Sequence, residues 1–159
     1  MILYHGSNMS IDAVDLKRSK RAKDFGQGFY LSKDIEQAQK MAELTTFRQS
    51  VGYPTITAFN IDDSFLLSCS FNIKIFEGYT EEWAEFVLMN RRNSTSEPAH
   101  SYDIVVGPIA DDKVGVQIRR FIMGYISCHQ LMDELSYING PTIQYFFGTE
   151  RAIQLLKRI

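Results

Sequence analysis

The sequence predicts an α+β fold built around a mainly antiparallel β-sheet with flanking helices. Short runs of β-branched and aromatic residues gather toward the two ends of the chain, and helical patterns lie between and after them. Strands and helices do not alternate regularly, as they would in a parallel sheet wound from βαβ units. We therefore expect the first and last strands to pair near the centre of the sheet.

Five stretches have the composition of strands: residues 1–4, 29–31, 55–61, 104–106 and 143–147. The first stretch is followed by the letters HGSN, all of which favour turns. We therefore expect the first strand to end at Tyr4 and to deliver His5 to its end.

Four stretches have helical spacing of apolar residues: residues 33–45, 81–90, 114–125 and 150–157. The hydroxyl groups of Ser32 and Thr149 precede the first and last of these, where they can cap the helix. In the first helix one face is predicted to carry Ile35, Ala38, Met41, Ala42 and Thr45.

Length and composition favour a single domain spanning residues 1–159. The chain is 45% hydrophobic and 23% charged, which is enough to bury a core without disulfides or metals. Cys69 and Cys128 lie far apart, and together with His100 and His129 they form no ligand spacing, so no metal site is predicted. The opening MILYHGSN lacks a basic and apolar leader, and we expect a cytoplasmic protein.

Charge and hydropathy narrow the partners that the sequence predicts. No apolar run approaches the ~18 residues that a spanning helix needs, so no membrane partner is expected. The net charge of −2 does not predict nucleic-acid binding through the overall field. Residues 17–23, KRSKRAK, form a local basic run that either contacts phosphates or is a solvated loop.

Three short motifs carry the chemistry: LYHGS at 3–7, FGQGFYL at 25–31 and TIQYFF at 142–147. Taken singly, Tyr30 reads as a core residue and Gln144 as a solvent-facing strand residue. The Gly-x-Gly of the second motif lacks the third glycine and the βαβ surroundings of a Rossmann site. Only the order of the three motifs makes them specific.

In that order, His5, Tyr30 and Gln144 resemble the His, Tyr and Glu of ADP-ribosyltransferases of the diphtheria-toxin and poly(ADP-ribose) polymerase type, with Gln in the third place. The resemblance implies split, antiparallel-dominated sheets with flanking helices. The whole chain is also similar to a family of small bacterial proteins with YHGS, DFGxGFYL and YDIVVGPxADD motifs and a closing TExA helix.

The resemblance implies that NAD is the co-substrate. The Gly6 backbone would pair with the nicotinamide carboxamide, His5 with the adenosine ribose, and the Tyr30 ring would stack on nicotinamide. Met41 stands where related enzymes close the other ring face with an aromatic residue, and its thioether can also pack there. The remaining residues of this expected NAD-binding set are Ser7 and Gly28.

Gln144 would occupy the catalytic position, where it can hydrogen-bond a sugar hydroxyl beside the reacting carbon. An amide cannot ionise, so it cannot act as a general base or stabilise a cationic sugar by charge. Glu150, six residues on, is a substitute, although its place at a helix start favours a structural role.

Three functions follow from these expectations. The first is transfer of ADP-ribose from NAD to a protein or nucleic-acid acceptor, with the chain as the toxin of a bacterial pair and a small antitoxin protein as its partner. The second is a weak or inactive module that binds NAD, ADP-ribose or another protein. The third is hydrolysis of NAD by water.

Overall fold

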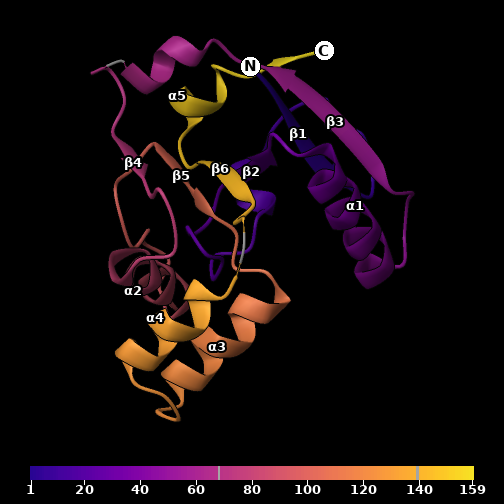
Figure 1. Cartoon of the computed structure of the whole chain (residues 1–159). Helices are drawn as coiled ribbons and strands as arrows, with labels where there is room; N and C mark the ends of the chain where they lie inside the picture. Colours follow the sequence, from indigo (N-terminus) through magenta and orange to yellow (C-terminus); the bar gives the residue numbers. More distant parts are fainter. Residues whose placement is uncertain (68, 139) are drawn as a thin grey trace.

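The computed structural model describes residues 1–67, 69–138 and 140–159, which form a mixed α+β protein (Figure 1). Its described strands make one seven-stranded sheet. In order across the sheet they are β4 (Ile73–Ile75), β5 (Ile104–Pro108), β6 (Ile143–Phe147), β2 (Phe29–Ser32), β1 (Ile2–Ser7), β3 (Thr55–Asn60) and β7 (Lys157–Arg158).

All neighbouring strands pair antiparallel except β4 and β5, which are parallel. The expectation of an antiparallel-dominated sheet is therefore confirmed. The expectation that the first and last strands pair with each other is wrong. β1 and β6 both flank β2, while the short β7 pairs with β3 at the sheet edge.

The sheet divides between β1 and β2. These strands share one register pair, Tyr4 with Ser32, whereas β1 pairs with β3 through six residues and β2 with β6 through four. One half of the sheet is therefore β4, β5, β6 and β2, and the other is β1, β3 and β7. The two halves spread apart beyond Tyr4 and Ser32.

β1 is longer than its turn-forming residues predict. It continues through Ser7, because His5, Gly6 and Ser7 pair in register with residues 57, 56 and 55 of β3. The expectation that the strand ends before His5 is wrong, because the long-range pairing of β1 with β3 overrides the local preference of these residues for a turn. His5, Gly6 and Ser7 of the first motif therefore lie on a strand and not in a loop.

The described helices are α1 (Ile35–Gln49), α2 (Glu81–Arg91), α3 (Asp112–Ile122), α4 (Cys128–Ser136) and α5 (Glu150–Ile153). Side chains cap each N-terminus by accepting a backbone N–H of the first turn, and Thr149 does so for α5 as expected. The cap of α1 is Asp34 and not Ser32, whose hydroxyl instead accepts the Asp34 N–H. The last helix ends at Ile153 and not at Lys157, which belongs to β7.

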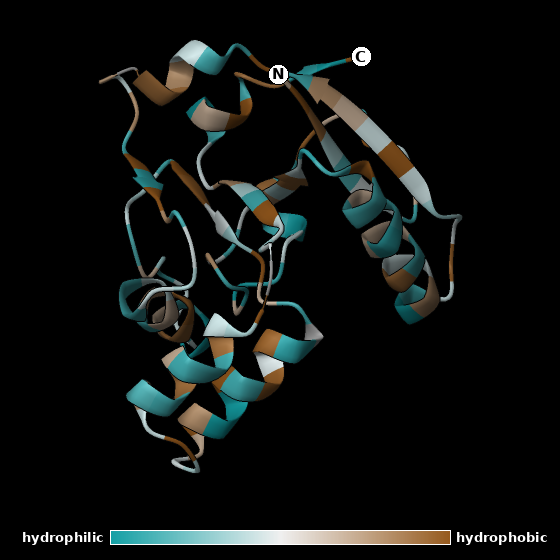
Figure 2. Ribbon diagram, in the orientation of Figure 1, coloured by the Kyte–Doolittle hydropathy of each residue, from teal (hydrophilic) through white to brown (hydrophobic). Residues whose placement is uncertain are grey.

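Helices cover the sheet unevenly (Figure 1). α1 lies against β1 and β3, and α2, α3 and α4 gather beyond the other half of the sheet. In Figure 2, α3 and α4 carry both hydrophilic and hydrophobic residues along their length, as helices with one buried side do. Among the described residues, no helix is long and apolar enough to cross a membrane.

Two apolar clusters lie on opposite faces of β5 and β6. Val105 and Phe146 pack with α2, α3 and α4, while Ile104 and Phe147 pack with residues of β1, β2 and β3. Successive residues of a strand point to opposite faces, so both faces of these strands are buried. Gln144 alternates with Phe146, which directs it to the face that the three helices cover.

Candidate functional site

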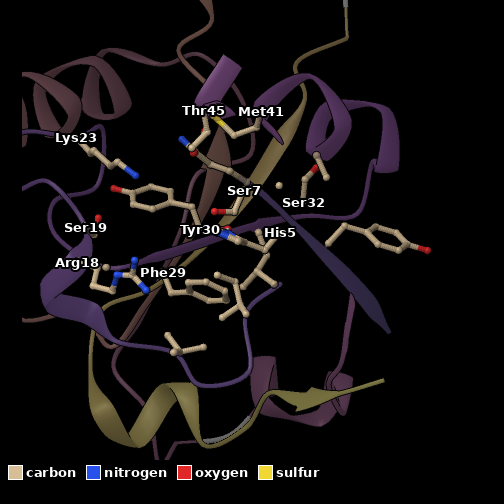
Figure 3. Close-up of a pocket in the computed structure, with 18 of the residues that line it drawn as sticks. His5, Ser7, Arg18, Ser19, Lys23, Phe29, Tyr30, Ser32, Met41 and Thr45 are labelled. Atoms are coloured by element: carbon tan, nitrogen blue, oxygen red, sulfur yellow. The ribbon is translucent and has the colours of Figure 1, made fainter. Parts of the chain in front are cut away.

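A cleft of about 710 Å³ opens where β1 and β2 separate. Its walls come from these strands, from α1 and from the connection between β1 and β2 (Figure 3). All the site residues expected from the sequence line it: His5, Gly6, Ser7, Gly28, Tyr30, Met41 and Gln144. The separation of the two strands thus brings together three motifs that are distant in sequence.

His5 bridges the gap between the separating strands. Its Nδ1 lies 2.7 Å from the Tyr30 carbonyl oxygen, and its ring stacks on Phe29 with centroids 4.3 Å apart. Burial lowers the pKa of His5 to about 4, although the bond to the Tyr30 carbonyl opposes that shift. The imidazole is therefore neutral at pH 7.

The hydrogen bond also fixes the tautomer of His5. A carbonyl oxygen can only accept, so Nδ1 carries the proton and Nε2 is an acceptor. Nε2 has no hydrogen-bond partner among the described residues, and no fully buried side-chain nitrogen or oxygen there lacks one. Nε2 therefore keeps some exposed surface and can accept a hydrogen bond from a hydroxyl group in the cleft.

Within the described part of the chain, the strand register leaves the backbone N–H and C=O of Gly6 without a strand partner on the β2 side. Met1 and Ile61 form two backbone hydrogen bonds with each other, at 2.7 and 2.9 Å. Hydrogen-bonded pairs alternate along an antiparallel ladder, so every second residue from Met1 onward bonds to β3. Tyr4 and Gly6 direct their N–H and C=O groups to the other side, toward β2. Tyr4 meets Ser32 there, but Gly6 lies beyond the last register pair, at the cleft.

The missing side chain of Gly6 has a separate explanation. A Cβ at this position would lie 1.8 Å from the Ala38 carbonyl oxygen and 2.8 Å from the Ala42 nitrogen. The glycine therefore allows α1 to pack closely on β1. Gly28 is similar, since a Cβ there would lie 2.2 Å from the Phe146 ring.

Tyr30 presents a ring face to the cleft with its hydroxyl already bonded. The hydroxyl donates to the Gly26 carbonyl at 2.6 Å and accepts the Phe25 N–H at 3.1 Å. The ring packs edge-on against Phe146, with centroids 5.2 Å apart. Burial raises the pKa of Tyr30 well above its usual value, so the phenol stays neutral. Its hydroxyl can therefore fix the backbone of residues 25 and 26, and its ring can stack on a ligand.

Two residues of the basic run reach the cleft. Arg18 and Lys23 are among its lining residues, and in Figure 3 Lys23 lies beside the Tyr30 ring and Arg18 beside Phe29. The Lys23 ammonium stands 4.7 Å from the centre of the Tyr30 ring. Burial lowers the pKa of Lys23, although the neighbouring Asp24 carboxylate opposes that shift. The cleft therefore holds a cation over the aromatic face.

α1 supplies the third wall. Ala38 and Ala42 are buried, whereas Met41 is 40% exposed and turns its thioether toward the cleft with Thr45 beside it (Figure 3). A flexible thioether can pack against a flat ring entering from the cleft. Ser7 also lines the cleft, and its hydroxyl donates to the Asn8 side-chain oxygen at 3.3 Å.

Gln144 is only 8% exposed and is fixed at one end. Its Nε2 lies 3.4 Å from both the Asp24 Oδ2 and the Pro108 carbonyl oxygen. Its Oε1 has no bond within the described part of the chain, where every fully buried side-chain nitrogen or oxygen has one. This amide oxygen therefore keeps some exposed surface, and Gln144 lines the cleft.

Asp24 and Arg91 are cleft residues that sequence reasoning missed. The Arg91 guanidinium donates to Asp24 Oδ1 from Nε at 2.8 Å and from Nη2 at 2.6 Å. The sequence signal for Asp24 was its place as the first residue of the DFGxGFYL motif. Its neighbour in the cleft, Gln144, lies 120 residues away along the chain. Glu150, by contrast, is exposed at the start of α5 and is not a lining residue of the cleft.

A family model described as "Protein of unknown function (DUF3990)" matches residues 1–158. No curated protein and no solved structure matches the chain. The family match spans the three motifs and every residue that lines the cleft. Within residues 1–67, 69–138 and 140–159, no group of His, Cys, Asp and Glu is arranged to hold a metal ion.

Proposed function

The chain belongs to the family described as "Protein of unknown function (DUF3990)", and we propose that it is an NAD-dependent ADP-ribosyltransferase. In this proposal the cleft binds NAD⁺ and transfers its ADP-ribose to a macromolecular acceptor. The observation that carries the proposal is that Gly6, which lies beyond the last described register pair of β1 and β2, lines the same cleft as the Tyr30 ring.

The Gly6 backbone and the Tyr30 ring together suit nicotinamide. A primary carboxamide has both a donor and an acceptor, so it can satisfy the N–H and C=O of Gly6 together. The ring attached to it would then lie over Tyr30, where stacking contributes ~0.5–1.5 kcal/mol beyond burial. Met41 would contact the same ring from α1.

The rest of the cleft suits a dinucleotide. Ligand pockets usually have volumes of ~300–1,000 Å³, and this cleft of about 710 Å³ falls in that range. Arg18 and Lys23 bring two positive charges to the lining of the cleft, where a pyrophosphate could bind. The accessible Nε2 of His5 accepts a hydrogen bond of the kind that a ribose hydroxyl donates.

Gln144 contributes an acceptor at the reacting end. Its Oε1 can accept a hydrogen bond from the sugar hydroxyl next to the carbon that becomes cationic. Such a bond strengthens as positive charge develops on the sugar. The role fits an amide, because it requires an acceptor and no ionisation.

The same amide favours a second candidate function. Without a carboxylate at position 144, the cleft would bind NAD⁺ or ADP-ribose and turn over slowly or not at all. In that case the chain is a nucleotide-binding or protein-interaction module with the same pocket. Hydrolysis of NAD⁺ by water is the third outcome, and it uses the same residues without an acceptor.

One experiment separates these functions. The purified protein is incubated with NAD⁺ labelled in the adenosine part, with and without extract from bacterial cells. Label on protein or nucleic acid supports the transferase, and free labelled ADP-ribose supports the hydrolase. NAD⁺ that is bound but unchanged supports the module, and NAD⁺ that is neither bound nor changed contradicts all three.

Transfer to a macromolecule also connects with the toxin expectation. A transferase that modifies an essential host macromolecule stops growth, so expression of the chain alone in bacteria should be toxic. Growth of those cells at the normal rate, with folded protein present, would contradict this extension. The transferase proposal itself would stand.

A further inference from the structure

A carboxylate lies beside Gln144 in the cleft. Asp24 Oδ2 is 3.4 Å from Gln144 Nε2, and both residues line the same cavity. The Asp24 side chain is only 14% exposed, so this charge is partly withdrawn from water. Charges in such places exert stronger forces on a bound molecule than charges at the surface.

The backbone on either side of Asp24 is held firmly. The Phe25 N–H donates to the Tyr30 hydroxyl at 3.1 Å, and the Phe25 carbonyl accepts from His100 Nε2 at 2.8 Å. Phe25 is fully buried among aromatic rings. Asp24 is thus fixed relative to Tyr30, the residue on which nicotinamide would stack.

The two oxygens of the Asp24 carboxylate have unequal hydrogen bonds. Oδ1 accepts both Arg91 bonds, at 2.8 and 2.6 Å. Oδ2 has two longer contacts, with the Ala110 N–H at 3.2 Å and the Gln144 amide at 3.4 Å. Charge-assisted hydrogen bonds are usually ~2.7–2.9 Å long. Oδ2 is therefore weakly engaged and has capacity for a shorter bond to a ligand.

We propose that Asp24 is a catalytic residue, supplying through Oδ2 the negative charge that Gln144 lacks. This inference rests on the proposed function of the cleft. In it, the carboxylate faces the ribose carbon that bears nicotinamide, and Gln144 holds both the carboxylate and the neighbouring sugar hydroxyl. The acidic and amide roles are divided between a loop residue and a strand residue.

The bond between the ribose carbon and the nicotinamide nitrogen breaks, and its electron pair stays on that nitrogen, so nicotinamide leaves neutral. The cationic sugar is stabilised by Asp24 until an acceptor hydroxyl forms the new carbon–oxygen bond. The hydroxyl proton passes to Asp24 Oδ2 and then to solvent. The products are nicotinamide, the ADP-ribosylated acceptor and a proton.

The test uses Asp24→Asn and the double variant Asp24→Asn with Gln144→Glu. The single variant removes the carboxylate, and the double variant exchanges the acid and the amide without changing net charge. Nicotinamide release from NAD⁺ is measured together with NAD⁺ affinity by calorimetry and thermal unfolding. We expect the single variant to release nicotinamide ~10²–10⁴-fold more slowly, with affinity within a few-fold of the parent. We expect the exchange to recover at least tenfold of that loss.

A matched control separates catalysis from the loss of an ion pair. Asp103 also receives two bonds from one arginine, Arg151, but it lies outside the lining of the cleft. Asp103→Asn should lower the unfolding temperature and leave nicotinamide release per folded molecule unchanged. A slowing equal to that of Asp24→Asn would assign the effect to stability and overturn the inference.

The remaining outcomes are also decisive. Asp24→Asn that binds NAD⁺ and releases nicotinamide at the parental rate overturns the inference and leaves the proposed function intact. Should Asp24→Asn not fold, the exchanged variant decides the matter. Exchanged protein that binds NAD⁺ but releases nicotinamide no faster than buffer overturns the inference. A parent protein that neither binds nor cleaves NAD⁺ removes the proposed function itself.

Discussion

The Nδ1 atom of His5 lies 2.7 Å from the carbonyl oxygen of Tyr30, just past the point where β1 and β2 stop pairing. A side chain here takes the place of a backbone ladder bond. It satisfies a carbonyl that the separation of the strands would otherwise leave exposed to the cleft. The pocket and the hydrogen bond therefore have one origin in the divergence of the sheet.

The first prediction concerns the stability of this contact toward pH. Burial lowers the pKa of His5 to about 4 in the folded protein, against the usual 6.5 of the unfolded chain. Between these values the unfolded state binds more protons, so the free energy of unfolding falls as the pH falls. Two-state titration with these values gives a loss of about 2 kcal/mol from pH 7 to pH 5. Urea unfolding at both pH values measures it.

His5→Asn is the control for that measurement, because its amide keeps a donor for the Tyr30 carbonyl and does not titrate. The variant should lose ~2 kcal/mol less than the parent between pH 7 and pH 5. His100, whose pKa burial also lowers, is present in both proteins and its effect cancels. An identical pH dependence in the two proteins would show that His5 is not buried as described.

The second prediction separates the two parts of Tyr30. Tyr30→Phe keeps the ring in the cleft and removes the hydroxyl that bonds both the Phe25 N–H and the Gly26 carbonyl. Leaving these groups without partners should lower the free energy of unfolding by ~1–3 kcal/mol. NAD⁺ affinity should stay within a few-fold, since stacking needs only the ring. A stable variant with lost affinity would show that the hydroxyl, and not the ring face, meets the ligand.

How far the sequence predicts this molecule depends on whether the decisive contacts are local. The strand at 143–147 and the cap at Thr149 were predicted correctly, because alternation and capping are read from adjacent residues. α4 was missed, although Ser127 and Gln130 form a capping box at its start. The length of β1 was wrong because its pairing with β3 is a long-range interaction.

The candidate site divides in the same way. The order of the motifs predicted a set of residues that line one cleft, but it assigned no part to Asp24. The contact between Asp24 and Gln144 requires β6, which carries Gln144, to lie beside β2, and no local pattern encodes that neighbourhood. The basic run was left open between phosphate contact and solvent, and only Arg18 and Lys23 of its charged residues line the cleft.

The third prediction concerns packing at Gly6. In Gly6→Ala, the new methyl group would overlap the Ala38 carbonyl oxygen and force α1 away from β1. The expected cost is ~1–3 kcal/mol or more in the free energy of unfolding. Gly115→Ala is the matched control, because nothing lies within 4 Å of its added Cβ on α3. That variant should gain ~0.5–1 kcal/mol. Equal unfolding temperatures for the two variants would contradict the close packing of α1.

The fourth prediction concerns the cation over Tyr30. The Lys23 ammonium lies 4.7 Å from the ring centre, in the space that a stacked nicotinamide would share. Lys23→Ala should strengthen binding of free nicotinamide by ~2–5-fold, which is the loss of a competing contact worth ~0.5–1 kcal/mol. It should weaken binding of ADP-ribose, which has the pyrophosphate but no nicotinamide. Calorimetry with both ligands measures this, and Lys20→Ala, outside the cleft, should change neither affinity. Two affinities that move together would contradict a place for Lys23 between the two subsites.

The fifth prediction tests the contact of Asp24 with Gln144 without any ligand. Gln144→Glu places a second carboxylate about 3.4 Å from Asp24 Oδ2, if the new oxygen takes the place of Nε2. Two like charges at that separation raise the pKa of one carboxyl group in the folded protein above its unfolded value. The folded state then holds the extra proton at intermediate pH, so the variant loses stability relative to the parent as the pH rises. Urea unfolding of both proteins at pH 5 and pH 8 should show a larger deficit at pH 8. In the double variant with Asp24→Asn the second charge is gone, and the deficit should depend on pH less than it does in Gln144→Glu. A deficit in Gln144→Glu that is the same at both pH values would mean that the two side chains are not neighbours, and the division of roles between them would fail with it.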